Sequence, residues 1–217
     1  MDLSEFSPSS ALITVILIGL VPFVAVMITS FTKIVVVLSL LRNALGLQQV
    51  PPNLVINGLA LILSIYVMYP VLNEAIRNVS QFQDLDSDTS TVLESANLAK
   101  EPMRQFLIKH ADQREREFFL LTARKMLDKN SAHEMDIDDF IIIIPAFTVS
   151  ELTDAFKIGF LIFLPFIVID LVVANILMAM GMMMLSPTTV SLPFKILLFV
   201  IIEGWVKLSH GLVLTYV

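Results

Sequence analysis

The chain has 217 residues, of which 56% are apolar and only 16% are charged, with a net charge of -6 and a mean hydropathy of +0.82. This composition is too apolar and too poor in charge for an ordinary soluble domain, and it predicts a membrane-type protein. The absence of cysteine excludes disulfides, thiolate metal sites and cysteine nucleophiles. Because the chain is acidic and has no basic cluster, we expect no nucleic-acid partner.

The first predicted unit is an N-terminal apolar helical hairpin over residues 1–72. Its first helix is expected at about 10–42, in a long apolar run. Gly46 and the Pro-Pro pair that follows it end this helix and form a short turn. A second apolar helix then returns and is expected to end near Pro70.

Most of the charge lies in the next segment, residues 73–140, which hold nine of the fourteen Lys/Arg and fourteen of the twenty Asp/Glu. This pattern predicts a small, mainly helical soluble insert, in which Asp112 and Glu115 form a capping pair for one helix. Arg42 lies near the first connection and favours the cytoplasm for it under the positive-inside rule. The insert is therefore expected on the periplasmic side.

Residues 141–217 predict a C-terminal apolar helical hairpin with a Met-rich turn. Pro145 and Pro165 kink its first helix, and in lipid each carbonyl freed by a proline must find a partner within the protein. Two shorter apolar runs together make the last helix. The expected fold is an all-α membrane-type protein with two long kinked apolar helical hairpins and the small helical insert between them. The two hairpins are expected to supply four membrane-type helices of about 20 residues each.

Two isolated charges lie in the C-terminal hairpin. Asp170 has no charged residue within twelve positions on either side, and Lys195 is the other lone charge. An unpaired carboxylate in such a segment is costly, so a partner is expected and the two residues are predicted to pair. The alternative is that each charge faces water or a lipid headgroup.

A second group of charges begins the same hairpin. Glu151, Asp154 and Lys157 are spaced three apart on one side of a helix, so Asp154 and Lys157 are expected to form a local pair. Contact with a partner subunit is the alternative for this group. Lys33 is the corresponding charge of the first hairpin, and the sequence does not indicate its partner.

No catalytic motif is evident: the three histidines are dispersed, and the zinc-protease, serine-hydrolase and phosphate-loop patterns are absent. We therefore expect neither an enzyme nor a bound cofactor or metal. A stand-alone small-solute transporter or ion channel is an alternative, since broken helices and a lone Asp suit one. Against it stand the missing internal repeat and the small number of helices.

Three stretches carry a resemblance to a known family: TSFTKIVVVLSLLRNALGLQQVPPN (29–53), IPAFTVSELTDAFKIGFLIFLPFIVIDLVVANILMAMGMMMLSP (144–187) and SLPFKILLFVIIEGW (191–205). They resemble the SctR/FliP family, whose members are export-gate subunits of bacterial type III secretion systems. The resemblance covers nearly the whole chain apart from the insert. LGLQQVPPN and an amino terminus that we expect to be retained are more similar to the virulence injectisome branch than to the flagellar one.

The resemblance implies an oligomer of about five copies of this chain with SctS and SctT-type membrane subunits around a channel for unfolded, secreted polypeptide cargo. It implies a site in the bacterial inner membrane, in contact with membrane lipid, and hairpins raised out of the bilayer plane toward the periplasm. Asp170 and Lys195 are expected to pair within one subunit or, as the resemblance suggests, between neighbouring subunits. Lys33, Glu151, Asp154 and Lys157 are possible subunit contacts.

The family's methionine gasket corresponds here to Met182, Met183 and Met184. Methionine is unbranched and polarizable, so it adapts to irregular surfaces better than Leu or Ile. Gly181 and Pro187 indicate a distorted turn, in which several of the three side chains could point to one side. The alternative is that the methionines fill gaps in a helical core or face lipid.

Overall fold

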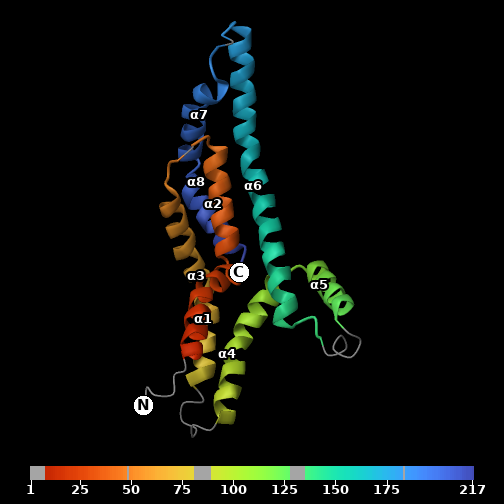
Figure 1. Cartoon of the computed structure of the whole chain (residues 1–217). Coiled ribbons are helices and arrows are strands. Elements are labelled where there is room, and N and C mark those ends of the chain that lie inside the picture. Colours follow the sequence, from red (N-terminus) through yellow and green to blue (C-terminus); the bar gives the residue numbers. More distant parts are fainter. Residues whose placement is uncertain (1–7, 48, 81–88, 128–134, 183) are drawn as a thin grey trace.

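The computed structural model describes residues 8–47, 49–80, 89–127, 135–182 and 184–217, and it confirms an all-α membrane-type fold. Within these ranges every regular element is a helix (Figure 1). The helices are α1 (Pro8–Met27), α2 (Phe31–Ala44), α3 (Asn53–Ser80), α4 (Thr89–His110), α5 (Gln113–Met126), α6 (Phe140–Ala179), α7 (Pro187–Ile201) and α8 (Gly204–Leu214).

The longest helix, α6, is the spine of the molecule and runs from beside α5 to the upper end in Figure 1, while α3 and α4 extend below it. Its 40 residues, with Pro145 and Pro165 inside, correspond to about 60 Å at 1.5 Å per residue. That is about twice the ~30 Å of a bilayer's hydrocarbon core. The helix α2 packs along α6, and α7 packs beside its upper part.

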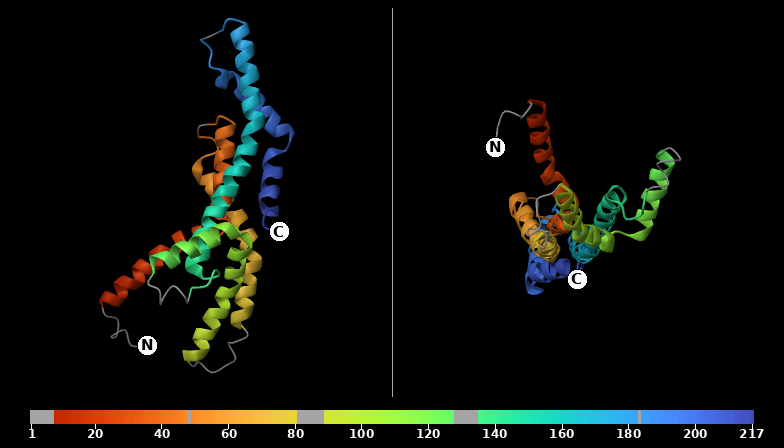
Figure 2. Two further views of the ribbon diagram at one scale, coloured as in Figure 1. Left: turned by 90° about the vertical axis from the view of Figure 1, so that its right-hand side faces the viewer. Right: turned by 90° about the horizontal axis from the view of Figure 1, so that it is seen from below.

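The expected first helix over about 10–42 is divided into α1 and α2, which corrects the sequence prediction. Thr32 donates its hydroxyl to the carbonyl of Val26 at 3.0 Å, and buried Ser30 donates to the hydroxyl of Ser64 at 3.1 Å. Hydroxyl side chains can satisfy polar groups in this way where a helix breaks in an apolar setting. The break lets α1 splay away from the other helices, as Figure 2 shows.

The helix α3 was expected to end near Pro70, but it continues through this proline to Ser80. Its last turns lie beside α4, so the two helices extend downward together (Figure 2, left). Asn78 strengthens this pairing by donating its side-chain amide to the carbonyl of Leu98 at 3.3 Å. The position expected for the start of the insert, residue 73, therefore falls inside a continuous helix.

Three clusters of buried side chains hold the helices together. The base cluster joins α3, α4 and α6 and includes Met68, Leu107 and Phe147. The middle cluster joins α2, α3, α6 and α8, and the upper cluster joins α2, α6 and α7 around Phe166 and Phe199. Beyond the upper cluster α6 and α7 continue as a pair, and we call residues 168–194 the tip hairpin (Figure 1).

By length and composition, α3 and α6 are each able to cross a membrane. The pair α7 and α8, bent by 60° at a short break, could make a third crossing if it counts as one span. The sequence predicts four membrane-type helices, whereas the described part of the chain supports two or three. The difference lies in part in the first hairpin, where the break leaves α2 with only 14 residues.

Gly159 permits the close approach of α6 to α2. A Cβ atom at this position would lie 2.2 Å from Cδ1 of Leu40. We expect Gly159→Ala to lower the free energy of unfolding by about 1–3 kcal/mol, because overpacking forces the two helices apart. The measurement is the thermal unfolding midpoint of the full chain in mild detergent.

Gly58→Ala in α3 is the matched control, because a Cβ there has no heavy atom within 4 Å. It should leave the midpoint unchanged or raise it, since alanine is favoured over glycine in a helix by up to about 1 kcal/mol. Equal loss in the two variants would show that the contact with Leu40 does not limit helix packing.

Candidate functional site

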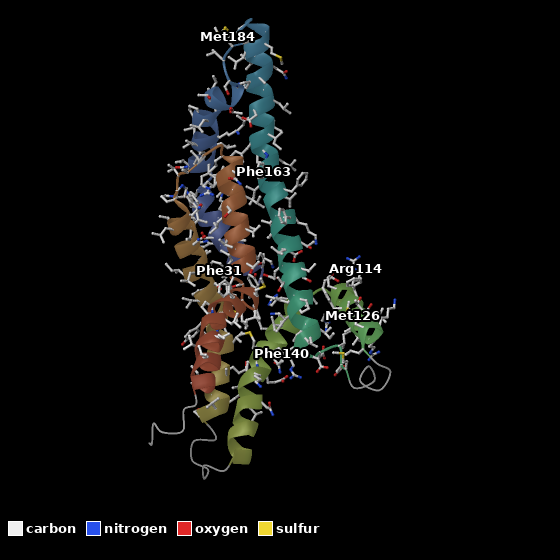
Figure 3. The ribbon with its side chains drawn as sticks, in the orientation of Figure 1. Phe31, Arg114, Met126, Phe140, Phe163 and Met184 are labelled. Atoms are coloured by element: carbon white, nitrogen blue, oxygen red, sulfur yellow. The ribbon has the colours of Figure 1, made fainter. Side chains whose placement is uncertain are left out.

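The Met-rich turn lies at the end of the tip hairpin, where Figure 3 labels Met184. The last turn of α6 is closed by two backbone bonds, from Met182 N to Leu177 O at 2.9 Å and from Gly181 N to Met178 O at 3.0 Å. With Gly181 at a φ of 71°, this is the Schellman arrangement that ends many helices. The glycine therefore turns the chain out of the helix just before the methionine triplet.

The methionines that the structure describes in this turn are exposed. Met184 is fully accessible, Met182 is 42% exposed, and Met178 and Met180 are also exposed at the end of α6. Met183 lies outside the described residues. Within the chain these side chains therefore have little cover, in contrast to the gap-filling methionine Met68 in the base cluster.

An apolar groove runs between α6 and α7 directly below this turn. Its walls include Val172, Ile176, Met180, Met182, Leu185 and Phe194. Elsewhere on α6, Phe160, Leu164 and Leu171 are also exposed. Exposed apolar grooves and patches mark places where protein or lipid binds.

Asp170 and Lys195 lie together at the start of the tip hairpin. Lys195 Nζ is 2.6 Å from Asp170 Oδ2, Ser191 donates its hydroxyl to the same carboxylate, and Lys195 also donates to the carbonyl of Ala44 at 3.3 Å. The carbonyl of Ala44 belongs to the end of α2, where a helix favours a cation. In the structure the two charges meet within one chain and join α2, α6 and α7.

Lys33 and Glu151 form a second ion pair, deep between α2 and α6. Lys33 Nζ lies 2.8 Å from Glu151 Oε1, and both side chains are almost fully buried. Tyr216, just after α8, donates its hydroxyl to the same carboxylate, and Lys33 Nζ lies 4.5 Å from the centre of its ring. Neither this partner of Lys33 nor the role of Tyr216 is predicted by the sequence.

The other charges of this group remain on the surface. Asp154 and Lys157 pair at 3.0 Å with exposed side chains, and Asp154 lies 3.9 Å from Lys33. These two are accessible to a neighbouring subunit. Lys33 and Glu151, which were considered with them as possible subunit contacts, instead direct their side chains into the interior of their own chain.

His110, at the end of α4, packs near this pair through Tyr216. Its ring packs against Phe106 at 4.8 Å and against Tyr216 at 5.0 Å between centres. Burial, followed by the charges of Lys109 and Lys33, lowers the pKa of His110 to about 4. The imidazole is therefore neutral near pH 7 and adds no second positive charge next to Lys33.

The fold and these sites define a class of protein: an all-α membrane-type subunit whose internal charges are paired and whose long helices present uncovered apolar faces. Comparison with known sequences identifies the family. The sequence model of the FliP family matches residues 12–212, so the chain belongs to the FliP family. This confirms the resemblance found from the sequence alone.

Several characterised relatives are similar along almost their whole length. "Pathogenicity-related ORF2" of Xanthomonas campestris pv. glycines is 54% identical, over 96% of both chains. "Yop proteins translocation protein R" of Yersinia pestis is 51% identical, over 94% of both. "Hypersensitivity response secretion protein HrcR" of Ralstonia nicotianae is 49% identical, over 96% of this chain and 97% of the relative.

The Asp170–Lys195 pair should respond asymmetrically to substitution, because the Lys195 side chain is 5% exposed and that of Asp170 is 30% exposed. Asp170→Asn leaves a buried ammonium without its counter-charge, and we expect a loss of about 3 kcal/mol in the free energy of unfolding. Lys195→Met leaves a carboxylate that still has Ser191 and some solvent, so its cost should be less than half as large. Thermal unfolding of the two variants in detergent measures the difference.

The double variant carrying both substitutions is the control. It removes both charges and should be more stable than Asp170→Asn alone. A larger loss in Lys195→Met than in Asp170→Asn would contradict the burial argument.

Proposed function

We propose that this chain is a core subunit of the export gate of a type III secretion system of the virulence type, in the bacterial inner membrane. The observation that carries the proposal is the tip hairpin, a pair of apolar helices that ends in exposed methionines and has little cover from the described part of the chain. Membership of the FliP family and the secretion and translocation roles printed in the relatives' names support it. The family is one of structural subunits of a secretion apparatus, and no catalytic role is proposed.

The apolar faces of α6 and α7 are proposed to pack against sister copies and partner subunits. About five copies, with SctS and SctT-type subunits, would surround a channel for unfolded polypeptide. The exposed Phe160, Leu164 and Leu171 on α6 support this arrangement, because covering them removes apolar surface from water. Asp154 and Lys157 are accessible at the surface and are proposed as polar contacts between subunits.

Part of α6 is proposed to lie outside the bilayer, in a complex that protrudes toward the periplasm. The length of α6, about 60 Å, exceeds what a simple crossing requires. The internal prolines support the same proposal, since the carbonyl that each one frees finds partners more readily among packed helices than in lipid.

Met182, Met183 and Met184 are proposed to form the constriction of this channel. Several copies of a flexible, polarizable side chain would close around cargo of changing shape. When no cargo is present, the same apolar ring would exclude water and, with it, ions. The exposure of Met182 and Met184 at the end of a projecting hairpin supports this role, because they are free to meet the methionines of other copies.

The main alternative is a transporter or ion channel that works alone. Solubilisation in mild detergent separates the two proposals. A gate subunit should copurify with two other membrane proteins of the SctS and SctT type, in a complex that holds several copies of this chain. A stable particle that contains this chain alone and transports a small solute would favour the alternative.

Replacing Met182, Met183 and Met184 together by alanine should raise the resting ion conductance of the assembled complex by at least about threefold, because a wider constriction no longer excludes water. The measurement is conductance across a membrane that contains the complex, with no cargo present. Met126→Ala on α5 is the matched control, since Met126 is exposed but far from the tip hairpin (Figure 3). Normal assembly with unchanged conductance would refute the constriction.

A further inference from the structure

After α8, one of the last three residues, Tyr216, is buried. Leu214 and Val217 are 68% and 90% exposed, whereas Tyr216 between them is only 8% exposed. Its side chain enters a socket whose walls come from α2, α4 and α6. The large side chain of Tyr216 is thus buried although the residues on either side of it are exposed.

Each wall of the socket makes a different contact with Tyr216. Glu151 of α6 accepts a hydrogen bond from its hydroxyl, and Lys33 of α2 lies over its ring at 4.5 Å. Phe106 of α4 stacks nearly parallel to the ring, with 6.0 Å between centres and an angle of 18°. His110, also of α4, meets the ring edge-on.

These contacts complete the buried ion pair. A carboxylate removed from water needs a compensating charge and hydrogen bonds. Lys33 Nζ supplies the charge, 2.8 Å from Glu151 Oε1, and the Tyr216 hydroxyl donates a hydrogen bond to Oε2. The ammonium of Lys33 in turn gains the negative face of an aromatic ring. The pair between α2 and α6 therefore depends on a residue from a third part of the chain.

The opposite end of α8 is a sharp bend. Glu203 adopts the left-handed conformation, with a φ of 54° and a ψ of 44°, and separates α8 from α7. Non-glycine residues in this region carry backbone strain. Between the bend and Tyr216, α8 contributes one fully buried large side chain, Leu212, to the middle cluster.

We propose that Tyr216 is a latch that holds α8 against the base of the molecule. While the latch is closed, α8 is fixed at Leu212 and at Tyr216, and the bend at Glu203 is maintained although it is strained. When Tyr216 leaves the socket, α8 pivots at Glu203 and withdraws Leu212 from the middle cluster. The latch thus couples α7, the second helix of the tip hairpin, to α2, α4 and α6.

The absence of cysteine from the sequence makes the test direct, because one introduced thiol is the only reactive thiol. Ala111→Cys reports on the socket, since Ala111 is buried in the same cluster as Tyr216. Ala60→Cys reports on the region below α8, since Ala60 is buried in the same cluster as Leu212. Each probe is placed in the full chain in mild detergent, and its rate of labelling by a maleimide is measured.

Tyr216→Ala should raise the labelling rate of both probes by about tenfold or more, because local opening exposes buried sites. Tyr216→Phe keeps the ring and loses the bond to Glu151, so it should raise both rates by a smaller factor. Val217→Ala is the matched control and should leave both rates unchanged, because this side chain is exposed.

Two results would overturn the latch. If Tyr216→Ala accelerates labelling only at Ala111→Cys, Tyr216 is an ordinary packing residue and does not control α8. If both Tyr216 variants label at the control rate, the socket does not hold the segment. Neither result depends on secretion or conductance, so the latch and the export function are tested separately.

Discussion

The packing of α2 against α6 is the constraint on which the rest of the structure depends. At one point along this contact Gly159 lets the helices approach closely, and at another Lys33 and Glu151 meet in a buried ion pair. The first feature requires that no side chain intervene, and the second requires that the two charges stay within reach. Together they set the register of the two helices. A shift of one helix along its axis would separate Gly159 from its close contact with α2 and would leave Lys33 and Glu151 buried without their partners.

The remaining helices take their positions from this pair. The ion pair draws the segment after α8 toward the base, and the carbonyl at the end of α2 receives Lys195 from α7. The spine α6 thus connects two regions of different character. Near its lower end α6 carries the buried ion pair of Lys33 and Glu151, whereas at its upper end the described methionines are exposed.

Much of the fold was predictable from the sequence. The long apolar runs indicated α3 and α6, and Asp112 does cap α5, accepting a hydrogen bond from the amide of Arg114 at 2.9 Å. The break between α1 and α2 was missed because hydroxyl residues in an apolar run are also compatible with a continuous helix. The continuation of α3 through Pro70 was missed because contacts with α4, made far away in the sequence, outweigh the local effect of a proline.

The candidate sites were predictable to different degrees. Residues of unusual type in a uniform background stand out, so Asp170, Lys195 and the methionine triplet could be selected from the sequence. The partner of Lys33 could not, because charge spacing identifies neighbours only within one helix. Tyr216 had no signal at all, since a single tyrosine after an apolar helix has many possible positions, and only the assembled socket selects one.

The exposed tip hairpin has a consequence for the order in which a complex is built. In a single copy the groove between α6 and α7 is open, and in the proposed complex a neighbouring subunit would cover it. An uncovered apolar groove favours non-specific association, so the supply of this chain would have to be matched to that of the proposed partner subunits. Synthesis in excess would therefore lead to aggregation or degradation of orphan copies.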